Sequence, residues 1–211
     1  MRIVSVNVGL PRTILWKGRP VQTGIFKEAV AGRQRVRRLN LDGDQQADLS
    51  VHGGPDKAVY AYPIEHYDFW RHFLGEIDLL PGAFGENLTV EGLTEESVHI
   101  GDRFRIGTAE LTVTQPRTPC YKLAAKFGRT DIVRRFLESG FSGFYLSVQQ
   151  EGELSQGDTI HVIERETHQV CIADLNRIQR GEAVDIRLLR KAVQIKALPE
   201  GWRNAIRESI P

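Results

Sequence analysis

Short runs in which apolar and polar residues alternate, each bounded by a glycine-containing turn, dominate the sequence up to about residue 165. Two of them share one plan, because a Gly-Asp pair leads into the runs 101–106 and 157–163. Two further runs, 13–16 and 20–23, flank Lys17-Gly18-Arg19 as the strands of a hairpin do. A chain that turns this often favours a mainly β fold of the barrel type.

Helical patterns interrupt these strands and then take over the C-terminus. Three single helices are predicted, at residues 64–74, 121–127 and 131–139. After Arg165 three more follow, at 169–180, 182–198 and 200–209. The sequence therefore predicts an α+β chain with a β-barrel domain over residues 1–165, helices packed outside it, and a three-helix region over residues 166–211. We expect the apolar positions of that region to serve packing.

Charge and composition argue against several classes of partner. The 28 Lys and Arg residues nearly balance the 27 Asp and Glu residues, so no overall field draws the chain to nucleic acid or anionic lipid. No apolar run approaches the roughly 20 residues of a membrane span, and residues 1–7 alternate like a strand instead of a secretory signal. Two cysteines give no disulfide framework. We expect a cytoplasmic protein that binds neither nucleic-acid polymers nor membranes.

Cys120 lies in a loop, residues 115–122, that restrains the backbone and concentrates positive charge. Two prolines fix φ angles beside it, and Arg117 and Lys122 flank it. A thiol near cations tends toward the thiolate, which attacks electrophiles or binds a soft metal. The other interpretation of a single cysteine is an inert, buried side chain, and we adopt that one for Cys171 in the first C-terminal helix.

The run His52-Gly53-Gly54-Pro55-Asp56-Lys57 permits two interpretations. Paired glycines let the backbone approach an anion closely, and exposed N–H groups beside the Lys57 ammonium would form a phosphate cradle. The same run is also a good tight turn. It lacks the glycine spacings of the common nucleotide-binding loops, so the sequence does not favour a nucleotide.

The run Phe84-Gly85-Glu86-Asn87-Leu88 also permits two interpretations, of which spacing alone favours the second below. It could bring a carboxylate and an amide to a pocket, where Asn87 would both donate and accept hydrogen bonds as the edge of a pterin ring requires. Alternatively, it is the entrance to a strand with solvated polar residues.

The remaining charged residues indicate less. The histidines do not favour zinc, since His66 and His72 are six positions apart and no His-Glu-x-x-His occurs. The arginine-rich run 33–38 is expected to be the outer face of a strand, with the alternative that one arginine turns inward toward an anionic cofactor.

Five motifs, taken in order, resemble those of the MOSC domain family in its bacterial YiiM-type branch. They span residues 23–27, 42–48, 52–57, 82–88 and 115–120. The resemblance covers almost the whole chain, because the predicted three-helix region also matches the appendage of that branch. It implies a β-barrel that binds the molybdenum cofactor (molybdopterin), with Cys120 as the sulfur ligand of the metal.

The resemblance also implies an activity. YiiM-type members reduce N-hydroxylated compounds, such as hydroxylaminopurine-like bases, amidoximes and hydroxylamines, by two-electron cleavage of the N–OH bond at molybdenum. A flavoprotein reductase is the implied electron donor. On this basis His52 or Glu86 would assist as proton donor, with His52 preferred because its ordinary pKa lies near neutrality. The residues expected to hold the cofactor are Gly53, Gly54, Lys57, Asn87, Gln115, Arg117 and Lys122.

Two other functions stay open on the sequence. In the first, Cys120 carries a persulfide or simply holds the cofactor, so the protein is a sulfur-relay or cofactor-carrier protein. In the second, Cys120 and His52 form a metal-free cysteine hydrolase, which requires the two groups within hydrogen-bond reach and an orienting third residue.

Overall fold

The structure is a computed structural model that describes residues 1–48 and 53–210. Strands come first along the chain and helices gather toward its end. The strands are β1 (Arg2–Val8), β2 (Arg12–Trp16), β3 (Arg19–Thr23), β4 (Glu28–Ala29), β5 (Gln34–Val36), β6 (Val59–Pro63), β7 (Leu88–Glu91), β8 (Arg103–Ile106), β9 (Ala109–Pro116), β10 (Phe144–Gln150), β11 (Gly152–Leu154) and β12 (Ile160–Glu164). The helices are η1 (Pro55–Lys57), η2 (Ile64–His66), α1 (Tyr67–Phe73), α2 (Tyr121–Phe127), α3 (Ile132–Ser139), α4 (Ile172–Gln179), α5 (Ile186–Ala192) and α6 (Glu200–Ser209).

One mixed sheet organises the molecule, in the order β12-β8-β9-β10-β6-β7-β1-β4. Its neighbouring strands are antiparallel except for β6 and β7, which run parallel. All five residues of β6 are buried, as expected of a strand that is covered on both faces. The hairpin β2–β3 and the pair β5–β11 form separate small sheets.

The mainly β, α+β fold class is confirmed, but the sheet is not a closed barrel. Its order leaves β12 and β4 as edge strands. Near the two ends of the sheet, β1 approaches the segment that leads into β12 through one isolated bridge between Arg2 and Thr159. Three backbone hydrogen bonds support it, from Ile3 N to Asp158 O at 3.0 Å, from Gly157 N to Ile3 O at 2.9 Å and from Ile160 N to Met1 O at 3.1 Å. A bridge of this length is not a strand ladder, so closure is incomplete.

The predicted hairpin is present, although its turn is shorter than expected because Arg19 already belongs to the second strand. Strands β2 and β3 pair from Arg12 with Thr23 to Trp16 with Arg19. The turn residues Lys17 and Gly18 both have positive φ, 50° and 75°. Two such residues in a row are the signature of the tight turn whose twist matches paired strands.

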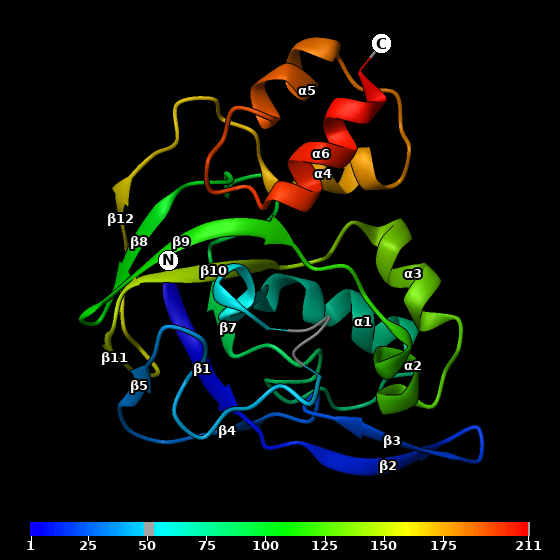
Figure 1. The fold of residues 1–211 in the computed structure, drawn as a ribbon. Coiled ribbons are helices and arrows are strands. Elements are labelled where there is room, and N and C mark those ends of the chain that lie inside the picture. Colours follow the sequence, from blue (N-terminus) through cyan, green and yellow to red (C-terminus); the bar gives the residue numbers. More distant parts are fainter. Residues whose placement is uncertain (49–52, 211) are drawn as a thin grey trace.

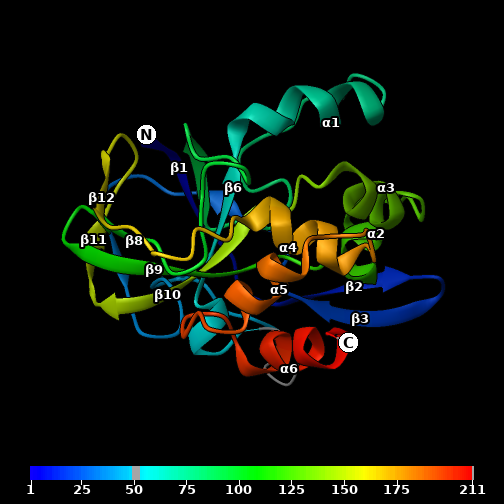
Figure 2. The same cartoon turned by 90° about the horizontal axis from the view of Figure 1, so that it is seen from above.

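The helices nearer the N-terminus agree closely with expectation. A 3-10 turn, η2, leads into α1, and α2 and α3 end at Gly128 and Gly140. These three α-helices gather beside the strand ends, to the right in both views (Figure 1, Figure 2). Between them lies an aromatic core in which Tyr62 stacks on Phe84 at 4.7 Å between ring centroids. No helix in the described ranges is long and apolar enough to cross a membrane.

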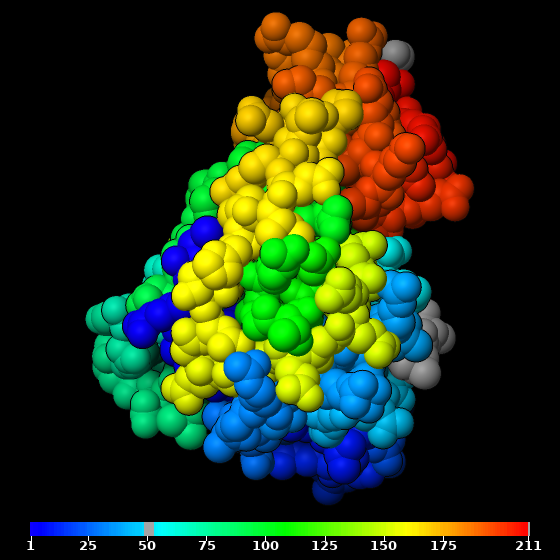
Figure 3. All heavy atoms as spheres, turned by 90° about the vertical axis from the view of Figure 1, so that its left-hand side faces the viewer, coloured from blue at the N-terminus to red at the C-terminus, as the bar shows by residue number. Residues whose placement is uncertain are grey.

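The C-terminal helices form a lobe at one end of the molecule (Figure 1, Figure 3). Helices α4 and α5 are shorter than the predicted segments, because α4 begins only after its N-cap Cys171 and the Asp185 side chain begins α5 by accepting from Arg187 N at 2.8 Å. Buried residues of the lobe, such as Ile172 and Ile206, belong to the same apolar core as the sheet. The division of the chain at residue 165 stays a prediction.

Candidate functional site

Strand β9 delivers the cysteine loop to the interior of the molecule. Arg117, directly after the strand, is buried, and its guanidinium donates hydrogen bonds to the Phe84 carbonyl and to the Tyr60 hydroxyl, the latter at 3.4 Å. It also lies over the Tyr60 ring, 4.9 Å from the centroid. These contacts fix the position of the loop, and Cys120 is the N-cap residue of α2.

The cysteine faces a small cavity of about 100 Å³. The cationic side chains of its lining come from three separate segments of the chain, because two of them belong to the cysteine loop. They are Lys27, Lys57, Arg117 and Lys122. None of the described lining residues carries a carboxylate. A half-buried thiol and four cations around one hollow favour an anionic ligand with an affinity for sulfur.

These cations differ in their hydrogen-bond and ion-pair partners. Lys27 forms a buried ion pair with Asp44. Arg117 is held by neutral oxygens, as described above. Lys122 is 8% exposed, and within the described ranges its ammonium has neither an ion-pair nor a hydrogen-bond partner. A buried ammonium in this position is costly unless an anion approaches it, so Lys122 is the strongest candidate to contact a ligand.

The glycine run lies at the edge of the same cavity. Gly53 and Gly54 both have positive φ, 94° and 86°. This conformation favours glycine and turns the backbone into the short helix η1, which carries Lys57 to the cavity wall. His52, the preferred proton donor in the sequence interpretation, lies outside the described residues.

The two amides expected at a pterin edge are occupied by protein contacts. Asn87 Oδ1 accepts from Tyr60 N at 3.1 Å, and its Nδ2 donates to Asp44 Oδ2 at 2.9 Å. Gln115 Oε1 accepts from the Trp202 indole N–H at 2.9 Å. Asn87 still lines the cavity of Cys120, whereas Gln115 lines a neighbouring one. Both amides brace the walls of the site.

Glu86 is fully buried and is not among the residues that line the cavity. Its carboxylate accepts hydrogen bonds from Gly82 N at 2.8 Å, Phe84 N at 3.0 Å and Thr89 Oγ1 at 2.9 Å, and from the Tyr67 hydroxyl. Burial, and next the charge of Glu86, raise the pKa of Tyr67, which keeps that hydroxyl protonated as a donor. This placement favours a structural role for Glu86.

Lys126 is a buried cation that the sequence analysis did not single out. Its ammonium donates to the carbonyls of Gly82 at 2.8 Å and Ile25 at 3.1 Å. Burial lowers the pKa of Lys126 from its ordinary value of 10.5 to about 8.

This pKa leads to a pH-dependent stability. Between pH 8 and about 10.5 the unfolded chain binds a proton at Lys126 that the folded chain has released, so the contribution of this group to the free energy of unfolding rises with pH. We expect the stability of wild type relative to Lys126→Met to increase from pH 7 to pH 10, measured by chemical denaturation. The exposed Lys196→Met is the control, and an equally flat difference for both variants would contradict the assignment.

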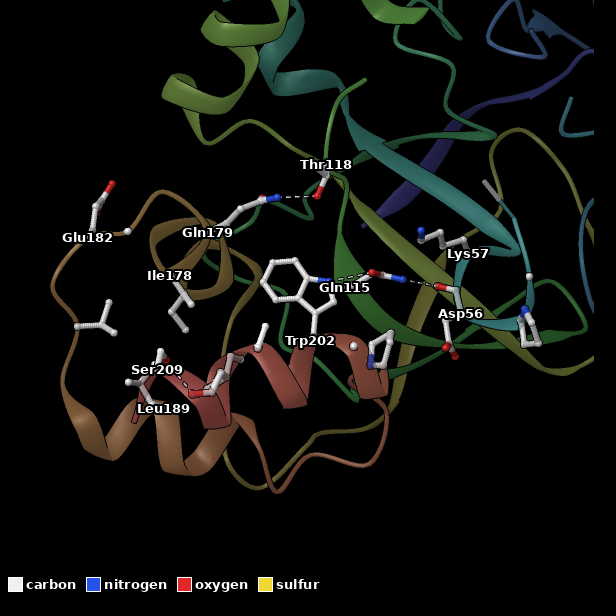
Figure 4. A pocket seen from close by; sticks show the side chains of 18 of the residues that line it. Asp56, Lys57, Gln115, Thr118, Ile178, Gln179, Glu182, Leu189, Trp202 and Ser209 are labelled. Atoms are coloured by element: carbon white, nitrogen blue, oxygen red, sulfur yellow. Dashed lines mark hydrogen bonds between the residues drawn. The ribbon is translucent and has the colours of Figure 1, made fainter. Parts of the chain in front are cut away.

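A second and larger hollow adjoins the first (Figure 4). It measures about 970 Å³ and shares Gly53, Lys57 and Thr118 with the cavity of Cys120. Helices α4 and α6 form its far wall, so the C-terminal region does more than pack against the sheet. Sequence reasoning missed this contribution because the helical period of the region accounts equally well for a purely apolar interface.

Known proteins resemble this chain over most of its length. A profile of the MOSC domain matches residues 48–161. The uncharacterized protein YflK of Bacillus subtilis (strain 168) is 44% identical over 201 residues, which are 95% of this chain and 90% of that protein. The crystal structure of YiiM from Geobacillus stearothermophilus superimposes with a TM-score of 0.82 at 36% identity, over 100% of this chain and 99% of the other.

A longer fungal protein is also similar. A protein of Gibberella moniliformis (strain M3125 / FGSC 7600) named "Reductase" is 33% identical over 181 residues. These residues are 84% of this chain, but the match spans only 32% of the fungal protein. The similarity is therefore confined to about a third of the fungal protein.

Proposed function

The chain belongs to the MOSC domain family as a YiiM-type member, and from this premise we propose that it is a molybdenum-cofactor-dependent reductase of N-hydroxylated compounds. The family supports a function associated with the molybdenum cofactor, and the fungal relative's name supports an oxidoreductase role. The observation that carries the proposal is the cavity in which Cys120 faces four cations and no described carboxylate.

The residues present fit an anionic, sulfur-ligated cofactor. Cys120 offers the soft donor that molybdenum accepts. Lys122 and Lys57 would hold the terminal phosphate, with the N–H groups around Gly53 and Gly54 as further donors. Arg117 would contribute its charge while it fixes the loop. Asn87 and Gln115 would set the walls, because their amides are already engaged.

The cofactor, when bound, would supply the two electrons that cleave the N–O bond. The balanced change is R–NHOH + 2 e⁻ + 2 H⁺ → R–NH₂ + H₂O. The chain's own task is to exclude water, orient the hydroxylated nitrogen and deliver protons. His52 stays the proposed proton donor, because the Glu86 carboxylate is buried and already accepts hydrogen bonds from the protein. The chain has neither a nicotinamide-binding glycine pattern nor enough cysteines for an iron–sulfur cluster, so a flavoprotein reductase is the proposed electron donor.

The experiment that tests the function uses protein made in a host that synthesises the molybdenum cofactor. Bound molybdenum is determined by elemental analysis, and N-hydroxylated compounds are then offered with a chemical reductant in place of the partner protein. Molybdenum with turnover is the expected result. Molybdenum without turnover would favour the cofactor-carrier function, and turnover without any metal would favour a metal-free enzyme.

Replacement of Lys57 with alanine is expected to weaken cofactor retention. Loss of one charge-assisted contact to a phosphate costs roughly ten- to a hundredfold in affinity. The measurement is the molybdenum that stays bound after serial dilution of folded protein. Lys191→Ala, at an exposed position on α5, is the matched control. Equal retention in both variants would move the phosphate site toward Lys122.

A further inference from the structure

The two adjoining hollows differ sharply in charge. Four cations line the cavity of Cys120, whereas the larger cavity has Lys57 as its one described cation beside the carboxylates of Asp56 and Glu182. An anionic group is therefore drawn toward Cys120, and the larger cavity suits a neutral molecule.

The larger cavity is also apolar where the helices face it. Aliphatic side chains from α4, α5 and α6 line it, together with one indole. The aliphatic residues are Ile178, Leu189 and Ile206, with Val184 between α4 and α5, and the indole is that of Trp202. Trp202 is the sole aromatic residue among the described lining residues. A volume of about 970 Å³ is at the upper end of the usual range for small-molecule sites.

Two side-chain hydrogen bonds connect this helical wall to the cysteine loop (Figure 4). The Trp202 indole N–H donates to Gln115 Oε1 at 2.9 Å, and Gln179 Nε2 donates to Thr118 Oγ1 at 2.6 Å. The first bond satisfies the indole N–H and fixes the orientation of the Trp202 side chain. The indole ring then lies along the cavity. A fixed aromatic face at small entropic cost is well suited to a flat ligand.

We propose that the larger cavity holds the substrate and that the Trp202 ring is the surface on which a flat, uncharged aromatic or heteroaromatic ring stacks. The inference rests on the proposed function for the identity of the reacting group. Because the two cavities share Gly53, Lys57 and Thr118, a ring bound beside Trp202 directs its N-hydroxyl substituent toward Cys120. Trp202 is thus a specificity-determining residue contributed by the C-terminal helices.

The test separates ring stacking from the hydrogen bond to Gln115. Trp202→Phe keeps an aromatic face and loses the indole N–H, whereas Trp202→Leu removes the aromatic face as well. Adenine, a neutral ring that cannot be reduced at an N–OH bond, is titrated by calorimetry into protein that lacks molybdenum. We expect binding close to wild type for Trp202→Phe and about tenfold weaker binding for Trp202→Leu. Molybdenum content of protein from the cofactor-producing host should be the same in all three.

A kinetic comparison adds a second readout. In loaded protein, Trp202→Leu should raise KM for an N-hydroxylated purine about tenfold and leave KM for acetamidoxime, which has no ring, unchanged. Equal weakening of adenine binding in both variants, or no weakening in either, would overturn the stacking role. A loss of molybdenum with unchanged adenine binding would assign Trp202 to the cofactor instead. If adenine binding depends on Trp202 but loaded protein shows no turnover, the binding site is supported and the proposed reaction is refuted.

Discussion

Replacement of Cys120 with serine is expected to abolish molybdenum binding, and N-hydroxy reduction with it, in a protein that still folds. Serine supplies a hard oxygen where the metal requires a soft sulfur, so the ligand is lost while the volume of the side chain hardly changes. The loop itself is positioned by Arg117, whose contacts with Phe84 and Tyr60 do not involve the thiol. Molybdenum per protein chain and turnover are the two measurements, with a thermal melt to confirm the fold.

The second cysteine provides the matched control. Cys171 lies at the N-terminus of α4, where its backbone N–H donates to Asp174 Oδ2 at 3.2 Å. Burial raises the pKa of its thiol to about 11, so it is not a thiolate at neutral pH. Serine is a favoured residue at a helix N-cap, and Cys171→Ser should therefore retain both stability and molybdenum. Equal molybdenum in wild type and Cys120→Ser protein would refute the ligand assignment.

Local features of the fold could be predicted from the sequence, whereas the pairing of distant strands could not. The β2–β3 hairpin and the ends of α2 and α3 follow from turn residues within a few positions. The parallel pairing of β6 with β7, and the position of β10 between β9 and β6, join segments separated by many residues. Alternation along one strand says which residues are buried and nothing about which strand lies beside it.

Charge was the sequence signal that pointed to residues lining this cavity. Lys57 was chosen from the glycine run and Arg117, Cys120 and Lys122 from the cysteine loop, and the structure brings all four to one cavity. Lys27, at the end of the first of the five motifs, also lines it, although the sequence analysis assigned that lysine no role.

The polar residues were harder to interpret because their partners lie far along the chain. Asn87 is engaged by Asp44, and Gln115 by Trp202, 87 positions away. Whether an amide faces a ligand or a neighbouring strand depends on such contacts, and spacing within a motif does not report them. The motif around Glu86 is likewise compatible with a carboxylate in a pocket, and it does not report the contacts with Tyr67 and Thr89.

Glu86→Ala is expected to lower the free energy of unfolding by about 3–5 kcal/mol, the usual cost of removing one partner from a buried charged network. Four donors converge on this carboxylate, and alanine leaves the N–H groups of Gly82 and Phe84 and the hydroxyls of Tyr67 and Thr89 without it. For a chain of this length each kcal/mol shifts Tm by about 2–4 °C, so a thermal melt should show a fall of roughly 6–20 °C.

The exposed Glu96→Ala is the control for a carboxylate without this network, and its effect should stay within about 0.5 kcal/mol. Glu86→Gln adds a finer test, since the amide keeps the shape of the side chain but replaces one acceptor oxygen with a donor. If Glu86 Oε2 is the oxygen replaced, the amide group meets the N–H of Phe84, and the variant should still be destabilised. A Tm within about 2 °C of wild type for Glu86→Ala, together with lost turnover, would restore Glu86 as the proton donor, because a group in that role contributes to the reaction without holding the fold together.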